Sequence, residues 1–376
     1  MGKCLVTKLN GVVDNSSILR MGEMRFYVSK VDSATDKTQG FAIKVNKPVK
    51  LEILGEGYFT NKELTNNLGK TIMIDANNPN VFVSNNDVEI AVLDKYSITN
   101  VMSYYIGATG GSSPENKKFD IDGLKYSTNL NQLVFSGSQA FGDIENLSKL
   151  TKLTILNLGK TNVEGDIKAL TNLSLLTSLV LNLTKVYGNI SSLAAMTALT
   201  NVDFISSQVS GDISALSKLT ELTTVRMHGT NVNGNVNALS NLVKLQYFLA
   251  PNTSGDISAL SMLRELKEFS SISSTIVGDL AKLPSSCYSF DASNYKGSGF
   301  TWSSRASSSN IISISGSPKI ENIDKMLQDL AQCQAAIPDK TGTYNIISAI
   351  GTRTSASDAA VQTLQSKGYT VSITPA

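Results

Sequence analysis

The sequence is poor in the residues from which metal sites, disulfides and redox centres are built. Its 376 residues include one histidine, His228, and three cysteines, Cys4, Cys287 and Cys333. A single histidine excludes a metal site with several histidine ligands and allows at most one Ser-His-Asp triad. The cysteines are odd in number and far apart, so they fit neither a disulfide framework nor a zinc motif. We expect Cys287 and Cys333 to be core thiols, and we expect no metal and no cofactor.

Charge is scarce as well. Charged residues make up 17% of the chain, below the usual share of about a quarter, and 33 basic against 31 acidic side chains leave a net charge of +2. This balance provides no electrostatic footprint for nucleic acid or for an anionic membrane. Ser, Thr and Asn take the place of the missing charges, which indicates a folded protein with a neutral polar surface.

Long hydrophobic runs are absent. The N-terminus has no apolar core of the length that a secretory signal requires, and no segment approaches the roughly 18 apolar residues of a membrane span. Gly2 invites a myristoylation reading, but that motif needs Ser or Thr where Val6 stands. We therefore expect no membrane insertion, no lipid anchor and no standard export signal.

What the sequence has in abundance is a repeat. The tripeptide Gly-Asp-Ile, or a close variant, recurs with spacings of 23, 23, 23, 23, 21 and 23 residues. These tripeptides begin at Gly142, Gly165, Gly188, Gly211, Gly234, Gly255 and Gly278. Between them, leucines and other apolar residues stand in register, in the pattern L-x-x-L-x-x-L-x-x-L-x-L-x-x-T-x-V-x-G-D-I. The L-x-L step has the period of a strand, and the L-x-x-L steps suit a helical or 3₁₀ turn.

This pattern resembles the leucine-rich repeat, with Thr or Ser where that family usually has Asn. The resemblance covers residues 119–297 and implies about 7–8 coils of 23 residues stacked into a solenoid, because one coil cannot bury its leucines alone. Pro251 falls in the shortened repeat, where we expect a kink or a break in the strand ladder. A hinge for a partner is the alternative there.

The Asp or Asn after each repeat glycine admits two interpretations. A ladder of carboxylates could recruit Ca²⁺. We favour turn capping, in which the side chain accepts hydrogen bonds from nearby backbone amides. Asn189 and Asn235, which are neutral, weaken a metal requirement in this column.

The residues that flank the strand leucines should face outward on the concave sheet of such a solenoid. Six of them are candidate binding residues, namely Asn157, Asn182, Asp203, Arg226, His228 and Tyr247. The last four should form a cluster on adjacent coils. Repeat proteins use such surfaces to bind extended partners, so this cluster is either a binding patch for protein or glycan or a solvated sheet with incidental charge pairing.

The two ends of the chain lack the repeat. Residues 1–105 carry short alternating runs typical of a β-sandwich or small β-barrel, which we interpret as an anchoring domain, and residues 106–118 are a Gly- and Ser-rich linker. Residues 298–376 suggest a small α/β cap. Its expected elements are strands at 311–315, 345–349 and 369–373 and helices at 321–337 and 358–367. We expect a chain without residues 1–105 to keep a folded solenoid.

The predicted fold class is thus α+β/solenoid, with a β-rich N-terminal domain, a leucine-rich-repeat solenoid over 119–297 and a small α/β C-terminal cap. Residues 2–9 and 311–334 resemble segments of virion or surface proteins of Bacteroides-type bacteria and of their crAss-like phages and prophages. That resemblance implies a head fibre, tail fibre or decoration protein, assembled in the host cytoplasm and carried on the virion. It carries over no site residue.

Three functions compete at this level. The first is a non-enzymatic virion structural or attachment protein, a possible homotrimer, whose partners are other virion proteins or a host surface protein or glycan. The alternative is a bacterial leucine-rich-repeat adhesin or interaction scaffold at the cell surface. The third, a glycan-cleaving enzyme, requires two converging carboxylates, for which Asp203 and Glu268 are the leading candidates. We predict that the protein is not an enzyme.

Overall fold

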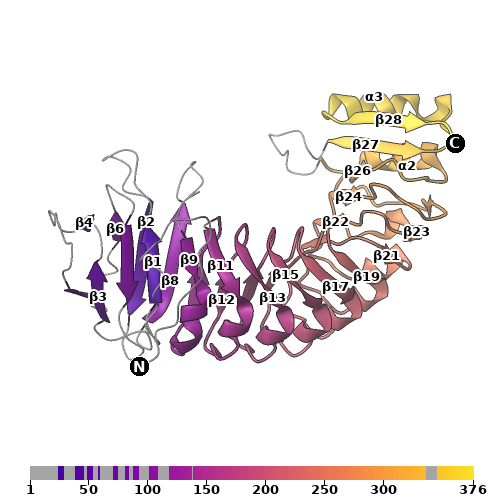
Figure 1. Ribbon diagram of the computed structural model, residues 1–376. Coiled ribbons are helices and arrows are strands. Elements are labelled where there is room, and N and C mark those ends of the chain that lie inside the picture. Colours follow the sequence, from indigo (N-terminus) through magenta and orange to yellow (C-terminus); the bar gives the residue numbers. More distant parts are fainter. Residues whose placement is uncertain are drawn as a thin grey trace, which may run out of the picture. The chain divides into compact units, whose positions relative to one another are not determined.

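The computed structural model describes the strands of the N-terminal region and, from Lys118 onward, all residues except 138 and 336–344. Of residues 1–117 only these strands are described, and they are described by backbone pairing. The chain divides into two compact units, Met1–Gly188 and Asn189–Ala376 (Figure 1). We describe each unit by itself.

The N-terminal strands of the first unit divide between two sheets. Strands β1, β7, β3 and β5 form consecutive antiparallel pairs in one sheet, and β8, β2, β6 and β4 do so in the other. Their bounds are β1 Met24–Val28, β2 Gln39–Val45, β3 Val49–Ile53, β4 Tyr58–Phe59, β5 Thr71–Ile74, β6 Val81–Val83, β7 Val88–Val92 and β8 Val101–Ala108. The β-rich N-terminal part is therefore confirmed.

Both sheets continue directly into the repeats. Strand β8 pairs in parallel with β10, the first repeat strand, through Ser103 and Gln132. Strand β9 (Lys118–Asp120) pairs with β1 on one side and with β11 on the other. Two of these N-terminal strands, β4 and β8, were missed by the sequence patterns. Because β8 runs to Ala108, strand structure also extends into the segment expected to be a linker; residues 109–117 lie outside the described residues.

Each coil of the solenoid has two strands and a 3₁₀ helix. In the first unit the short parallel strands are β10 (Gln132–Val134), β12 (Ile155–Asn157) and β14 (Ser178–Val180), and the second-sheet strands are β11 (Gln139–Asp143), β13 (Asn162–Asp166) and β15 (Lys185–Asn189). The 3₁₀ helices are η2 (Ile121–Tyr126), η3 (Ile144–Leu147) and η4 (Ile167–Leu170). The expected strand and turn of each repeat are both confirmed.

The second unit repeats this plan. Its parallel strands are β16 (Asn201–Asp203), β18 (Thr224–Arg226), β20 (Tyr247–Leu249), β22 (Glu268–Ser270), β24 (Ser289–Asp291) and β26 (Ser313–Ser315). Its second-sheet strands are β17 (Gln208–Asp212), β19 (Asn231–Asn235) and β21 (Thr253–Ser254), and its 3₁₀ helices are η5 (Ile190–Leu193), η6 (Ile213–Leu216), η7 (Val236–Leu239), η8 (Ile257–Leu260) and η9 (Leu280–Lys282). Strands β23 (Gly278–Asp279) and β25 (Phe300–Thr301) form a separate pair.

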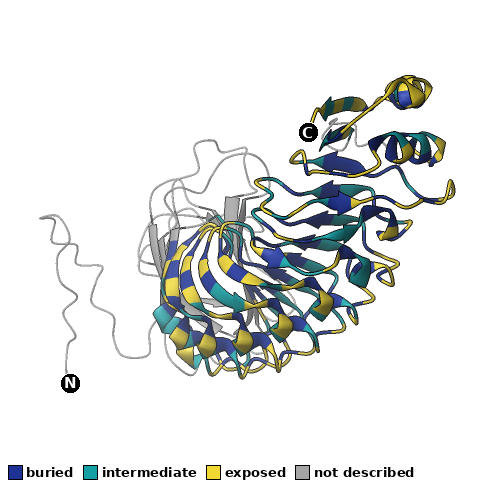
Figure 2. Ribbon diagram, turned by 90° about the vertical axis from the view of Figure 1, so that its right-hand side faces the viewer, coloured by how far each residue is buried: buried dark blue, intermediate teal, exposed yellow. Residues whose placement is uncertain are grey.

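The repeat leucines make the core. Leu150, Leu153 and Leu156 of one coil, like their counterparts in the following coils, have no solvent-exposed surface. Figure 2 shows the buried positions recurring from coil to coil. Late in the second unit the strand position is aromatic, and the rings of Phe248 and Phe269 stack with centroids 5.3 Å apart. Burial of these side chains drives the coils to stack, because each completes its neighbour's core.

The Asp/Asn column caps the 3₁₀ helices, as predicted. Asp143 Oδ1 accepts a hydrogen bond from the Glu145 amide at 2.8 Å, and Asn189 does the same for Ser191 at 2.9 Å. Every member of the column, from Asp120 to Asp279, occupies this N-cap position. A neutral Asn performs the role as well as a carboxylate does, since the cap needs only a side-chain oxygen.

The Thr/Ser column ties down the turn that follows each short strand. The buried hydroxyl of Thr161 donates to the carbonyl oxygen of Leu158 at 2.6 Å, and Thr184 and Thr230 make the equivalent bonds. A hydroxyl thus satisfies a carbonyl that would otherwise be buried without a partner.

The shortened repeat interrupts the second sheet, as the sequence predicted. Strand β21 has two residues where the preceding β19 has five, and the sheet ends at β21. Strand β20, which precedes Pro251, still pairs in full register with β22. The two missing residues lie between Thr253 and Gly255, so the second sheet alone is reduced here, to an isolated parallel bridge between Asp256 and Val277.

The C-terminal cap continues the parallel sheet with longer crossovers. Strands β27 (Ile346–Ile350) and β28 (Thr370–Thr374) follow β26, and helices α2 (Ile323–Gln332) and α3 (Asp358–Ser366) accompany them (Figure 1). All five expected elements of the cap are present, with η10 (Ser355–Ser357) in addition. Helix α2 ends at Gln332, earlier than expected, because Cys333 is already extended.

Buried polar groups lock the start of the cap. Arg305 is 7% exposed and donates to four backbone carbonyls, including that of Leu283 at 2.8 Å. Cys287 and Cys333 are buried and free, which confirms them as core thiols. Burial raises the pKa of the Cys287 thiol to about 11, so this thiol is protonated and unreactive at neutral pH.

Candidate functional site

The candidate site is the solvent-facing side of strands β16 to β26 in the second unit, called the strand face below. The middle residue of each short strand is buried. On β18, β20 and β24 both flanking residues reach the surface, whereas on β16, β22 and β26 one of the two is buried. Parallel pairing aligns these flanking residues in two rows. One row contains Thr224, Tyr247, Glu268 and Ser289, and the other contains Asp203, Arg226, Leu249, Ser270 and Asp291.

Asn157 and Asn182 lie in the first unit and shape turns. Asn157 ends β12, and its side-chain oxygen accepts a hydrogen bond from the Gly159 amide at 3.2 Å. Asn182 stands in the turn after β14, and its side-chain oxygen lies against Gly159. Both side chains are half-buried, so they stabilise the local backbone whatever else they contact.

Asp203 and Arg226 are direct neighbours in the second row. Asp203 is 8% exposed, and its Oδ1 accepts a hydrogen bond from the Ile205 amide at 3.1 Å. Burial raises the pKa of the Asp203 carboxyl, while the Ile205 bond and the charge of Arg226 oppose that rise. Arg226 is exposed, and among the described residues nothing accepts a hydrogen bond or ion pair from its guanidinium.

His228 belongs to a different group from its sequence neighbours. Its Nε2 lies 3.2 Å from the Ser270 hydroxyl, which in turn donates to Asp291 Oδ2 at 2.9 Å. Asp291 also accepts hydrogen bonds from the hydroxyls of Ser293, at 2.7 Å, and Ser315, at 3.0 Å. Burial lowers the pKa of His228, while the contact with Ser270 and the charge of Asp291 raise it.

This His-Ser-Asp group does not have the order of a catalytic triad. A nucleophilic serine needs the imidazole as its proton acceptor, with the carboxylate on the far side of the ring. Here the Ser270 hydroxyl donates its hydrogen bond to the carboxylate of Asp291. His228 therefore donates a hydrogen bond to the serine oxygen. The arrangement holds the imidazole in place and does not activate Ser270.

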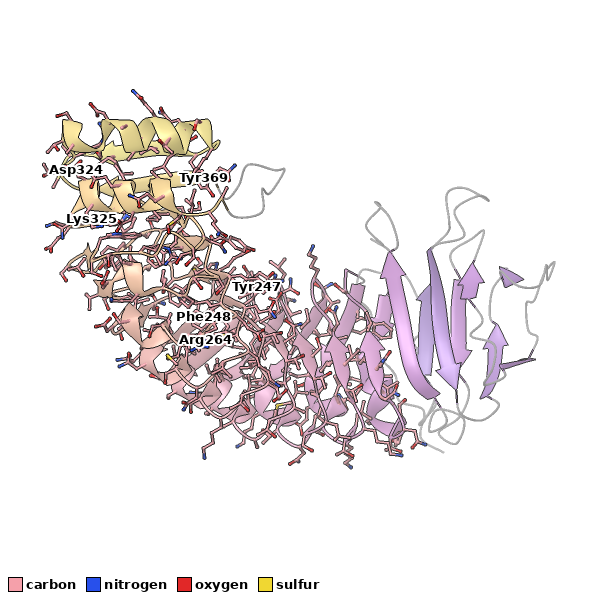
Figure 3. All side chains as sticks on the ribbon, turned by 180° about the vertical axis from the view of Figure 1, so that it is seen from behind. Tyr247, Phe248, Arg264, Asp324, Lys325 and Tyr369 are labelled. Carbon is pink, nitrogen blue, oxygen red and sulfur yellow. The ribbon has the colours of Figure 1, made fainter. Side chains whose placement is uncertain are left out.

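Tyr247 and Leu249 form the apolar part of the strand face. They flank the buried Phe248 on β20 and are both half-buried. Figure 3 labels Tyr247 and Phe248. The ammonium of Lys267 lies 5.7 Å from the centroid of the Tyr247 ring and donates to the side chain of Gln246 at 2.9 Å. Such a cation over an aromatic face restrains the ring.

Glu268 sits next to Tyr247 in the first row. Its Oε1 accepts a hydrogen bond from the Tyr288 hydroxyl at 3.0 Å, which leaves Oε2 for another donor. Thus the four clustered residues predicted from sequence lie on one face but in two groups. Arg226 lies next to Leu249 in one row, and Tyr247 lies next to Glu268 in the other. His228 contacts Ser270, which lies two coils further along the chain.

Three contributors were missed by the sequence patterns, namely Leu249, Ser270 and Asp291. The signal for Asp291 was the phased column Phe248, Phe269 and Phe290, which continues the strand period past the last recognised repeat. The link from His228 to Ser270 has no sequence signal, because 42 residues separate the two.

The carboxylates proposed for a glycan-cleaving enzyme do not converge. Asp203 on β16 and Glu268 on β22 are three strands apart and sit in different rows, which at the usual strand and residue spacings places their backbones about 16 Å from each other. Paired glycosidase carboxylates lie within roughly 5–9.5 Å. This geometry disfavours that pair as a hydrolytic centre.

In the described part of the chain, no three His, Cys, Asp or Glu side chains are grouped so that they could hold a metal ion. Within the same residues, none of the helices combines the length and the apolar character that a membrane span requires.

The chain has no match among protein-family models, and no curated protein is significantly similar to it. Among solved structures it resembles the plant peptide hormone receptor RGFR1 in complex with RGF2, with a TM-score of 0.55 and 17% identity over 76% of this chain. It spans 53% of that receptor chain. This likeness supports the leucine-rich-repeat solenoid.

Two bacterial structures are also similar. Internalin C2 from Listeria monocytogenes has a TM-score of 0.40 and 24% identity, covering 56% of this chain and 84% of its own. A leucine-rich-repeat protein from Leptospira interrogans has a TM-score of 0.42 and 12% identity, covering 57% of this chain and 51% of its own. The Leptospira protein is named for its leucine-rich repeats.

Proposed function

We propose that this protein is a non-enzymatic binding scaffold that recognises a protein or peptide partner through the strand face. The observation that carries the proposal is the partly exposed pair Tyr247 and Leu249 beside the unpaired guanidinium of Arg226. Tyrosine and arginine are the residue types that most often dominate binding energy at protein interfaces. The RGFR1 complex supports a peptide as the partner class, since that neighbour is named for its peptide hormone.

The solenoid favours an extended partner. Each coil adds one strand to the face at a regular spacing, so successive coils can contact successive residues of a bound segment. A rigid sheet also loses little conformational entropy on binding. The virtually neutral surface of the protein means that such contacts act at short range, without long-range electrostatic steering.

The test is a peptide display library panned on the full chain, with two double variants as probes. Tyr247→Ser/Leu249→Ser alters the strand face, and Val243→Ser/Met262→Ser removes apolar side chains that are 53% and 60% exposed. We expect enriched peptides to lose binding to the first variant and to keep binding to the second. Peptides that bind both variants equally well would contradict a strand-face site.

A glycan ligand is the competing outcome. The same two variants would be compared on a glycan array. Glycan binding that depends on Tyr247 and Leu249, with no peptide enriched, would overturn the peptide proposal and assign the face to a carbohydrate.

We further propose that the scaffold works at an exposed particle or cell surface. The resemblance of residues 2–9 and 311–334 to phage and prophage proteins supports a virion attachment role, and a bacterial surface adhesin is the alternative. Residues 2–9 lie outside the described residues. The solution mass of the full chain, measured by light scattering, tests the virion hypothesis. A homotrimer is expected of a fibre, whereas a monomer would favour the adhesin.

A further inference from the structure

The strand face has an order of charge that the proposed function does not use. Along the strand sequence β18, β20, β22, the face presents Arg226, then the apolar pair Tyr247 and Leu249, then Glu268. Asp291 follows on β24. The cation and the anion thus stand on opposite sides of one apolar strand.

Three other charges near these residues are already engaged. Lys267 is bonded to Gln246 and lies over the Tyr247 ring. Asp203 is 8% exposed, and its Oδ1 is bonded to the Ile205 amide. Asp291 already accepts bonds from three serine hydroxyls and the Ser293 amide. Arg226 and Glu268 are therefore the charges left available to a partner.

The spacing of these groups selects a ligand length. Arg226 and Glu268 are two strands apart and sit in different rows, so their backbones are about 12 Å apart at the usual strand and residue spacings. In an extended peptide, residues i and i+3 or i+4 are separated by roughly 10–13 Å. An apolar residue between them would lie over Tyr247 and Leu249.

We propose that the strand face binds an extended protein segment with an acidic residue, a central apolar residue and a basic residue, in an orientation set by Arg226 and Glu268. The acidic side chain pairs with the Arg226 guanidinium, and the basic side chain pairs with the free oxygen of Glu268. The apolar side chain packs on Tyr247 and Leu249. This inference rests on the proposed function and adds the chemistry and direction of the partner.

Charge reversal on the full chain provides the test. Libraries are panned on the unmodified protein, on Arg226→Glu and on Glu268→Lys. Arg264→Glu is the control, because Arg264 is exposed and lies on the turn between η8 and β22 and not on a strand. We expect acidic–apolar–basic sequences from the unmodified protein and from the control. Arg226→Glu should weaken these peptides about three- to tenfold, as expected for an exposed charge pair, and should select a basic residue at the formerly acidic position.

Two results would overturn the inference, and they are distinguishable. Peptides that depend on Tyr247 and Leu249 but show no charge order, or an order unchanged by both reversals, leave the binding scaffold standing and remove the assigned chemistry. A panning in which no peptide depends on Tyr247 and Leu249 removes the proposed function together with this inference. Circular dichroism of each variant confirms that it is folded before panning.

Discussion

At one turn of each coil the backbone adopts a left-handed conformation, and the residue there is often not glycine. Lys160, Leu183 and Ser206 have φ of 58°, 54° and 55°. For a residue with a Cβ, this conformation is sterically unfavourable by roughly 1–2 kcal/mol. Leu183 is 49% exposed, so its side chain returns little burial energy.

We therefore expect Leu183→Gly to stabilise the protein by about 1 kcal/mol. Glycine adopts positive φ without strain, and the larger conformational entropy that it loses on folding offsets part of this stabilisation. Urea unfolding followed by circular dichroism measures the change. Leu175→Gly is the control, because Leu175 is 52% exposed and is not among the described positive-φ residues. The control should destabilise; a loss of stability in both variants would show that the Leu183 turn is not strained.

His228 makes stability depend on pH. Its pKa is lowered in the folded protein, chiefly by burial, relative to the ordinary value of 6.5. The unfolded chain then binds a proton more readily than the folded chain between the folded pKa and pH 6.5. The contribution of a neutral His228 to the free energy of unfolding is fully present above pH 6.5. It is lost as the pH falls through the pKa that His228 has in the folded protein.

The variant His228→Gln should remove this part of the pH dependence, because Gln can still reach Ser270 but does not titrate. We expect the urea midpoint of the unmodified protein to fall more steeply from pH 7.5 to pH 5 than that of the variant. Parallel curves for the two proteins would mean that His228 titrates alike in the folded and unfolded chains.

At the scale of the coil, glycine and the Asp/Asn column work together. Gly234 has a φ of 133°, and a Cβ built on it would lie 2.7 Å from Asp212 Oδ1 of the preceding coil. The same Asp212 oxygen accepts the Ser214 amide at 2.8 Å. Glycine is therefore needed both for its backbone conformation and for the close approach of the neighbouring cap.

Replacing Gly234 by Ala should destabilise the protein by about 2–3 kcal/mol, because backbone strain and the clash with Asp212 add. Gly137→Ala is the matched control: φ is also positive, 73°, but nothing lies within 4 Å of the added carbon. We expect the control to lose about 1–2 kcal/mol. Equal losses in thermal and urea unfolding would show that the contact between coils contributes nothing.

Elements with a local signal were predicted well. The coils and the cap elements follow from apolar spacing, which is a property of neighbouring residues in the sequence. Strand β8 was missed, because Val101–Ala108 carries no clean alternation and its partners, β2 and β10, lie far away in sequence. Such a strand forms because its distant partners supply the hydrogen bonds, and its own residue pattern does not reveal it.

At the scale of the whole chain, the N-terminal strands cover the first coil of the repeats. The first repeat strand, β10, pairs with β8 through Ser103, Tyr104 and Tyr105. A solenoid whose first coil has no neighbour exposes a strand edge and one side of its core. The pairing therefore argues against the expectation that the repeats are indifferent to the loss of residues 1–105.

We expect a chain of residues 106–376 to be less stable than the full chain, with a lower unfolding temperature and a tendency to aggregate. Deletion removes most of β8 and leaves the β10 edge unpaired. Differential scanning calorimetry and size-exclusion chromatography measure the two effects. An unchanged unfolding temperature in a monodisperse truncated protein would restore the view of two independent parts.

The repeat, its 23-residue period, the buried columns and the capping role of Asp and Asn could be inferred from the amino-acid sequence. Each of these depends on contacts within one coil or between identical positions of adjacent coils, so periodicity is enough to reveal it. The contact of His228 with Ser270 and the pairing of β8 with β10 became visible in the folded structure alone. Those contacts join residues of unlike sequence across whole coils, and the distance between them is set by how the coils stack.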